Sequence, residues 1–254
     1  MAKTQDPDHL IIEVVEIQEG LEGRMHQESL RLLDRVTVEA FRLGDIPRGI
    51  DNFYDAFGPD PMFRYTGGTV PPSILHKTIM RYNFMTWTWT SIMLTIHHGV
   101  AVLRASPPHR TCLLERLLRG LIRIISGPMR LLLSAEQKKR NEEVDMKMKQ
   151  LNKDAGVEEK SKDWVYLEML FTAQKYQGQG FGSALVKTLT TWLDLSGQTS
   201  WVHALDSNEG FYNFHGFQTM GSITIAEENP EWHEDPFTLI VMVRYPKSSE
   251  IEKV

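Results

Sequence analysis

The segment that decides the fold begins Trp164-Val-Tyr-Leu-Glu-Met-Leu-Phe-Thr172 and continues, four residues later, as Gln177-Gly-Gln-Gly-Phe-Gly182. The first part is rich in aromatic and β-branched residues and predicts a strand. Residues 183–195 carry leucine and valine at helical spacing. Glycines let a backbone approach a ligand, and the first N–H groups of a helix lack partners. A strand, a glycine turn and a helix start therefore predict a pyrophosphate site.

Two common nucleotide-binding motifs do not fit this turn. A Walker A loop ends in Gly-Lys-Ser/Thr, which is missing here. A dinucleotide-binding turn has the spacing G-x-G-x-x-G and follows the first strand of a βαβ unit. Here Gly178, Gly180 and Gly182 are spaced by two and lie late in the chain. On these residues alone, a glycine turn without a ligand is the alternative.

A second motif follows about thirty residues after the first: Asn208-Glu-Gly-Phe-Tyr-Asn-Phe-His-Gly-Phe217. Together the two motifs resemble the signatures Q/R-x-x-G-x-G/A and N-x-x-FY-x-x-x-GF of the GNAT acetyltransferases, which bind acetyl-coenzyme A. Their order and their spacing make this resemblance specific.

A weaker resemblance covers the first half of the chain. Phe57-Gly-Pro-Asp-Pro61 is similar to a stretch of the GNAT branch that includes puromycin N-acetyltransferase and many fungal relatives. Residues 100–108, which end in two prolines, resemble a strand of the same branch. That branch has a tryptophan where this chain has Ala105, so the resemblance does not imply an aromatic contact with the acceptor there.

The resemblance implies an α/β (α+β) architecture, the GNAT fold. A central, mixed, mostly antiparallel sheet of about seven strands is flanked by helices and splays between the strands at 164–172 and 199–205. The family order implies a helix at 208–215 and final strands at 219–226 and 237–243. We expect a single domain over residues 1–254 with a charged helical insertion at about 110–162.

The resemblance also implies where acetyl-CoA binds, in the opening between the two splayed strands. Backbone N–H groups of the glycine loop would hold the pyrophosphate, with Gln177 fixing the loop. The thioester carbonyl would accept a hydrogen bond from the end of the strand at 170–172, and Asn208 would contact the pantetheine arm. The expected donor-binding residues are Leu170, Phe171, Thr172, Gln177, Gly178, Gln179, Gly180, Phe181, Gly182, Ser183, Asn208, Phe211 and Tyr212.

In this family the amine attacks the thioester directly, without an acyl-enzyme. The single cysteine, Cys112, lies outside both motifs, and no serine nucleophile motif is present, which suits that route. Tyr212 matches the position from which a tyrosine protonates the leaving sulfur in many relatives. A core aromatic with a satisfied hydroxyl is the structural alternative for Tyr212.

The general base is less sharply defined. Simple alternation along a strand places Tyr166, Glu168 and Leu170 on one face. Glu168 is unusual because a carboxylate is costly to bury among apolar residues, and relatives carry a catalytic Glu in the register of Tyr166. His203 on the next strand is the rival, and water is a third route. Glu168 and His203 could also be purely structural.

The rest of the chain predicts the remaining elements of such a domain. The expected elements are a strand at 10–17, a helix at 26–43 ended by Gly44 and Pro47, a helix at 52–65 broken at Gly58 and Pro59, a helix capped by Ser73 and running to about Phe84, and a hairpin of strands 86–96 and 100–103. The His97-His98 pair predicts a hairpin turn rather than a metal site, because adjacent strand residues point to opposite faces.

The expected insertion has two parts. Residues 113–125 form an amphipathic pattern with an arginine face, which indicates either packing over the core or a membrane-surface helix. Residues 135–163 contain sixteen charged residues, eight of each sign, which predicts an exposed helix that frays near residues 154–156 into a solvated linker.

Composition bounds the function. The chain has 254 residues, 41% apolar and 24% charged, with a net charge of −5, which favours an ordinary globular protein and excludes general binding to nucleic acid. One cysteine excludes an intrachain disulfide and a zinc site built on several cysteines. No signal peptide or membrane span is predicted, since residues 113–133 contain five charges. A cytoplasmic or nuclear location is expected.

The sequence therefore predicts an N-acetyltransferase that moves the acetyl group of acetyl-CoA to a primary amine of a small molecule. The expected partners are acetyl-CoA and that amine, with no metal and no nucleic acid, in a monomer or homodimer. A protein or polyamine acetyltransferase, or a non-catalytic acyl-CoA-binding protein, are the alternatives.

Overall fold

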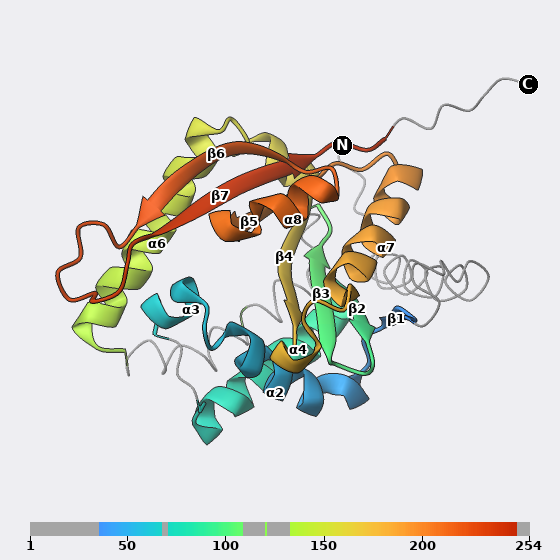
Figure 1. Cartoon of the computed structure of the whole chain (residues 1–254), viewed down its shortest axis with the longest axis horizontal. Helices are drawn as coiled ribbons and strands as arrows, with labels where there is room; N and C mark the ends of the chain where they lie inside the picture. The colour runs from blue at the N-terminus through green and yellow to red at the C-terminus, as the bar shows by residue number, and fades with distance from the viewer. Residues whose placement is uncertain (1–35, 68–70, 109–119, 121–132, 248–254) are drawn as a thin grey trace, which may run out of the picture.

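Seven strands form one mixed sheet in the order β1-β2-β3-β4-β5-β7-β6 (Figure 1). Its strands are β1 (Glu39–Ala40), β2 (Ile92–Ile96), β3 (Ala101–Ser106), β4 (Val165–Thr172), β5 (Ser200–Leu205), β6 (Gln218–Ile225) and β7 (Phe237–Arg244). The β4–β5 pair is parallel, and the other pairs of the sheet are antiparallel. The computed structural model describes residues 36–67, 71–108, 120 and 133–247. The predicted fold class is confirmed.

Helices cover both faces of this sheet. They are α2 (Ile46–Phe57), α3 (Pro61–Tyr65), α4 (Ile74–Thr90), α6 (Ala135–Asp154), α7 (Phe181–Leu195) and α8 (Glu209–Phe214), with short 3-10 turns η1 (Leu43–Asp45), η2 (Lys160–Asp163), η3 (Gln174–Tyr176) and η4 (Asp206–Asn208). One apolar cluster joins α7 and α8 to one face. On the opposite face α6 covers β5 and β7, and α2 with α4 covers β2 to β4. We call these the α7 face and the α6 face.

The sheet splays between β4 and β5, as predicted. The two strands pair only at their first residues, from Val165 opposite Ser200 to Leu167 opposite Val202. Beyond Leu167, β4 continues to Thr172 beside β3 alone, and β5 continues beside β7 alone. The second half of β4 therefore has one free edge.

A β-bulge lies where the splay begins. Arg104 of β3 is opposite Met169 and Ala105 is opposite Leu167, so Glu168 has no partner residue in β3. The extra residue shifts the alternation of the strand. Tyr166 belongs to the α6-face cluster, but Leu170 packs against the α7-face cluster. The expectation that Tyr166, Glu168 and Leu170 share one face is therefore wrong for Leu170.

The predicted helix at 26–43 is wrong over its described residues. Glu39 and Ala40 form β1 and pair with Thr95 and Leu94 of β2, so pairing with the sheet overrides the helical spacing. The expected role of Pro47 is also wrong. It lies in the first turn of α2, where its missing N–H costs nothing.

The predicted strand at 86–96 is wrong over its first residues, which continue α4 to Thr90. The threonines fit the helix because their hydroxyls donate one turn back, Thr86 to the carbonyl of Tyr82 (2.9 Å) and Thr90 to that of Thr86 (3.0 Å). The cap at Ser73 is confirmed, since its hydroxyl accepts a hydrogen bond from the His76 N–H. The break before Pro61 is also confirmed, with α2 ending at Phe57 and Asp60 capping α3.

The charged segment is a helix, as predicted, but it is not a solvated linker. Helix α6 packs along β6 (Figure 1). Its residues Val144 and Leu151 are buried between the helix and the sheet. The strand predicted at 10–17 and the helix predicted at 113–125 lie outside the described residues, apart from Gly120. Among the described residues, no helix is long and apolar enough to cross a membrane.

Candidate active site

The glycine loop has the geometry of an anion site. Gly178 and Gly180 have φ angles of +75° and +82°, the left-handed region that favours glycine. The first N–H bonded inside α7 is that of Ala184, which donates to the carbonyl of Gly180 (2.9 Å). The N–H groups of the three preceding helical residues point out of the helix start. The Gln177 side chain donates to the Thr172 carbonyl (3.1 Å) and so ties the loop to β4.

The two sequence motifs meet in space. A Cβ added to Gly182 would lie 3.6 Å from the ring of Phe211, so the helix start packs directly on α8. Tyr212 is the next residue, and Asn208 precedes α8 with its side chain exposed and not used as a cap. The loop, the start of α7 and α8 therefore form one continuous structure beside β4.

The free edge of β4 presents alternate backbone groups. Ala173 donates to the Val100 carbonyl (2.9 Å), and Phe171 lies opposite Val102. Because hydrogen-bonded pairs alternate in an antiparallel ladder, the N–H of Phe171 faces β3. The N–H groups of Leu170 and Thr172 then face the opening left by β5. Three residues, 170–172, were expected to donate to the thioester oxygen, and the N–H groups of two of them face the opening.

Glu168 is a paired carboxylate. Its Oε1 accepts a hydrogen bond from the Ser106 hydroxyl, and its Oε2 forms an ion pair with Arg104. The side chain is still 24% exposed, so one side of the carboxylate is open. Sequence reasoning found Glu168 but missed both of its partners. The signal was the charged Arg104 in the otherwise apolar run Ala101-Val-Leu-Arg-Ala105.

His203 and Tyr166 form a partly buried hydrogen-bonded row. The Tyr166 hydroxyl lies 3.1 Å from His203 Nδ1, and His203 Nε2 lies 2.8 Å from Asn152 Oδ1 of α6. Burial lowers the pKa of His203 to about 4, so the ring is neutral near pH 7. An amide oxygen accepts only, hence Nε2 carries the proton and the hydroxyl of Tyr166 donates to Nδ1. Burial, and next the nearby Glu168, raise the pKa of Tyr166.

Tyr212 is buried at the α7 face. Its side chain is 6% exposed, and its ring packs on Phe211 and Phe217 with centroids 5.1 and 5.6 Å apart. Burial raises the pKa of Tyr212 above its ordinary value, so the hydroxyl stays protonated at neutral pH.

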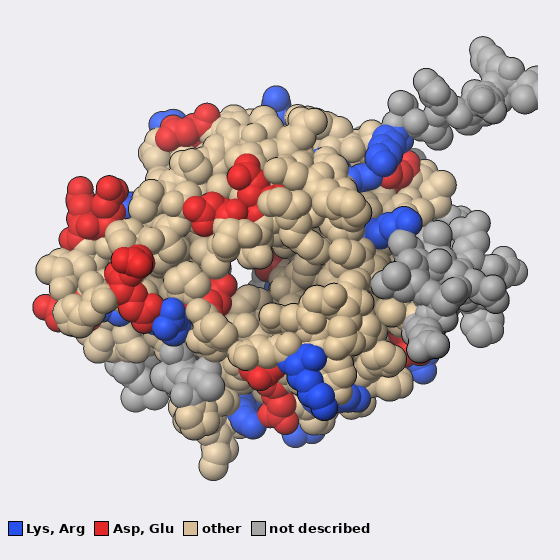
Figure 2. Space-filling view, viewed as in Figure 1, with Lys and Arg blue, Asp and Glu red and all other residues tan. Residues whose placement is uncertain are grey.

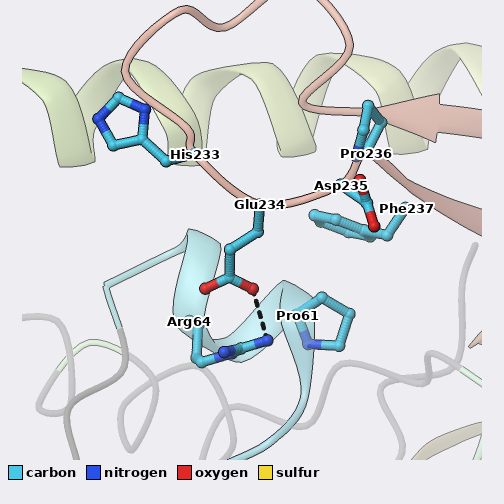
Figure 3. A pocket seen from close by; sticks show the side chains of 7 residues that line it. All are labelled: Pro61, Arg64, His233, Glu234, Asp235, Pro236 and Phe237. Carbon is cyan, nitrogen blue, oxygen red and sulfur yellow. Dashed lines mark ion pairs between the residues drawn. The ribbon is translucent and has the colours of Figure 1, made fainter.

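An opening is visible near the centre of the space-filling view (Figure 2). In Figure 1 the same place lies beside β4, on its side toward α3. A separate shallow hollow of about 430 Å³ lies between α3 and the β6–β7 loop. It is crossed by an Arg64–Glu234 ion pair of 2.6 Å (Figure 3). None of the expected site residues lines this hollow.

The described residues contain no group of three or more side chains suited to hold a metal ion. His97 and His98 form the turn between β2 and β3 with φ angles of +51° and +53°. His98 Nδ1 lies 3.2 Å from Asp45 of η1. The pair is therefore a turn, as predicted.

The two motifs meet where the start of α7 packs on α8, and both lie in a segment that matches a known family. Residues 133–229 match the acetyltransferase (GNAT) domain family. The GNAT match spans the chain from α6 to β6, including the splay, the glycine loop and Tyr212. None of the curated proteins matches the chain significantly.

Solved GNAT structures share the fold of almost the whole chain. Arylalkylamine N-acetyltransferase 2 from Aedes aegypti aligns over 84% of this chain and 100% of its own, with a TM-score of 0.60 and 16% identity. A "histone acetyltransferase HPA2 and related acetyltransferase" from Corynebacterium glutamicum aligns over 85% and 99%, with a TM-score of 0.51 and 18% identity. At such identities the likeness establishes the GNAT fold and leaves the substrate open.

Proposed function

We propose that this protein is an N-acetyltransferase that transfers the acetyl group of acetyl-CoA directly to a primary amine of a small molecule. One observation carries the proposal. The start of α7 packs on Leu170 of the free edge and on Phe211, the neighbour of Tyr212, and Glu168 lies where that edge begins. An acyl-CoA thioester needs these groups together: an anion site, carbonyl donors, an acid and a base.

The donor would lie along the free edge of β4. The loop N–H groups and the start of α7 would hold the pyrophosphate, because the positive end of the helix dipole favours anions. In this assignment four residues of the loop bind the donor through their backbone N–H groups and not through their side chains: Gln179, Gly180, Phe181 and Ser183. The N–H groups of Leu170 and Thr172 would donate to the thioester oxygen as negative charge develops on it. Asn208 and Phe211 would flank the pantetheine arm.

The transfer needs three proton movements. The acceptor ammonium loses a proton to Glu168, directly or through water, and the free nitrogen attacks the thioester carbon. The carbon–sulfur bond then breaks, and the thiolate takes a proton from Tyr212. The second proton, which the nitrogen loses as it becomes an amide, returns through water to the Tyr212 oxygen. His203 and Asn152 would support this chemistry by fixing the hydroxyl of Tyr166, whose second lone pair can accept a hydrogen bond from the amine or from water.

The expected acceptor is a small amine with an apolar group. Beside the bulge the α6 face carries Phe53, Phe57, Phe63 and Phe171, whose ring centroids lie 4.7 to 6.4 Å apart. Phe57 and Phe63 are partly exposed, so they can contact a ligand as well as the core. The resemblance of residues 57–61 to the puromycin-type branch supports the same class.

The test is acetyl transfer measured with purified protein by release of free CoA thiol, with a panel of small aromatic amines, polyamines and a lysine-containing peptide. We expect saturable transfer to the aromatic amines. Transfer to the peptide or to polyamines alone would move the acceptor to those classes. Acetyl-CoA binding by calorimetry without transfer to any amine would indicate the non-catalytic alternative, and absence of both would refute the proposal.

A further inference from the structure

The most tightly held charged group at the splay is Arg104. Its guanidinium carbon lies 4.3 Å from the ring centroid of Trp87 on α4, and its Nε donates to the buried Ser91 hydroxyl (3.1 Å) at the end of that helix. One of its terminal nitrogens pairs with Glu168. Arg104 therefore connects the end of α4 to the bulge of β4, with its side chain only 14% exposed.

Ser106 completes the arrangement from the same strand. Residues 104 and 106 lie on the same face of β3, on either side of the bulge, and each occupies one oxygen of Glu168. A carboxylate held at both oxygens cannot rotate, and each oxygen keeps a further lone pair. The open side of Glu168 therefore has a fixed direction.

We infer that Arg104 is a positioning residue for Glu168, whose carboxylate it holds in the orientation that receives the acceptor's ammonium. The inference rests on the proposed function. The guanidinium of Arg104 makes a charge-assisted contact with one oxygen, and the hydroxyl of Ser106 donates to the other, so the two contacts together fix the plane of the carboxylate.

The test compares kcat with KM for acetyl-CoA, measured with an accepted amine at one pH. In Arg104→Gln we expect kcat to fall by about 10- to 100-fold, because the carboxylate loses its fixed direction, while KM for acetyl-CoA stays within a few-fold. Ser106→Ala should lower kcat in the same way but less, since it frees one oxygen only. Arg104→Lys keeps the ion pair and should restore most of kcat. In a Glu168→Gln background, Arg104→Gln should cause no further loss.

Arg140→Gln is the matched control. Arg140 is also 14% exposed, pairs with Glu136 (2.8 Å) and lies over the rings of Tyr65 and Trp232, but it belongs to α6 away from the splay. It should lower stability and leave kcat unchanged. Folded Arg104→Gln with wild-type kcat would overturn the inference while the proposed function stands. If Arg104→Gln does not fold, Ser106→Ala decides in the same way. Wild-type protein that acetylates no amine would overturn the function itself.

Discussion

Two single residues at the splay lie in opposite surroundings. Tyr212 is buried in apolar surroundings, which keeps its proton on the oxygen. Glu168 is bonded to a guanidinium and to a hydroxyl. In the proposed mechanism Tyr212 is the acid and Glu168 the base, the two groups that direct transfer from a thioester to an amine uses.

Replacement of Tyr212 by phenylalanine tests the acid. We expect kcat to fall about 100-fold while KM for acetyl-CoA stays within a few-fold, because the hydroxyl acts on the leaving sulfur and not on donor binding. The loss should be uniform through neutral pH, since the raised pKa of Tyr212 places its deprotonation above the ordinary tyrosine range. Steady-state kinetics from pH 6 to 9 measure this. Near-normal turnover would make Tyr212 a packing residue.

At this scale the sequence predicts residue types better than directions. Tyr212 and Glu168 could be found because a motif and an unusual carboxylate mark them. The face of the sheet on which Leu170 lies could not be predicted, because nothing in the sequence of β4 indicates the bulge at Glu168. Asn152 has no local signal either, since it reaches His203 only through the packing of α6.

Among the elements, the glycine loop has a backbone conformation that suits its proposed role in binding phosphate. Gly180 caps α7 with a left-handed φ of +82°, and the helix start behind it offers unpaired N–H groups. A side chain here would project into the place proposed for the pyrophosphate.

The pair Gly180→Asp and Gly180→Asn separates charge from strain. Both residues tolerate the left-handed region to a similar degree and have nearly the same size. The carboxylate alone repels phosphate, so we expect acetyl-CoA affinity to fall much more in the Asp variant than in the Asn variant. Calorimetric titration measures both, with circular dichroism to verify the fold. Equal affinities in the two variants would contradict a phosphate site in this loop.

Helix α6 is fixed to the sheet by a buried polar network. The hydroxyl of Tyr65, which is fully buried, donates to Glu143 of α6 and accepts from Asn229 (2.9 Å) of the β6–β7 loop. Glu143 also accepts from the Ala226 N–H (3.0 Å). Three segments distant in sequence therefore meet at one phenol, and α6 in turn positions Asn152.

Tyr65→Phe should lower the free energy of unfolding by about 1–3 kcal/mol, because it leaves two buried polar partners without their hydrogen bond. Tyr54→Phe is the control. Tyr54 is also buried, but its hydroxyl makes no hydrogen bond within the described residues. Urea denaturation compares the two. A loss from Tyr65→Phe no larger than that from Tyr54→Phe would show that the network contributes nothing to stability.

The elements of the second half of the chain were predictable to within a few residues because two motifs fix their register. The first half was less so. The Thr- and Trp-rich residues 86–90 have strand propensity, yet they continue α4, where their hydroxyls bond within the helix. Residues 39–40 join the sheet only because β2 offers them a partner, which a sequence pattern does not contain.

For the molecule as a whole, His203 predicts sensitivity to acid. Its pKa is about 4 when folded and near 6.5 in an unfolded chain, so the unfolded state binds the extra proton between these values. Stability is full above about pH 6.5 and falls as pH drops toward 4, by up to about 3 kcal/mol. The free energy of unfolding, measured by denaturation at pH 7.5 and at pH 4.5, should differ less between the two pH values in His203→Gln than in the wild-type protein. His233 is exposed, so His233→Gln serves as the control and should keep the wild-type difference.

The splay also implies an uneven rate of amide hydrogen exchange along a single strand. In β4 the amides of Met169 and Phe171 are held by β3, whereas those of Leu170 and Thr172 face no strand. In the free protein, deuterium should replace the second pair much faster than the first. Saturating acetyl-CoA should slow exchange at Leu170 and Thr172 and leave their neighbours unchanged. These two amides in the second half of β4 thus become reporters of an occupied site, readable residue by residue in NMR spectra without any acceptor present.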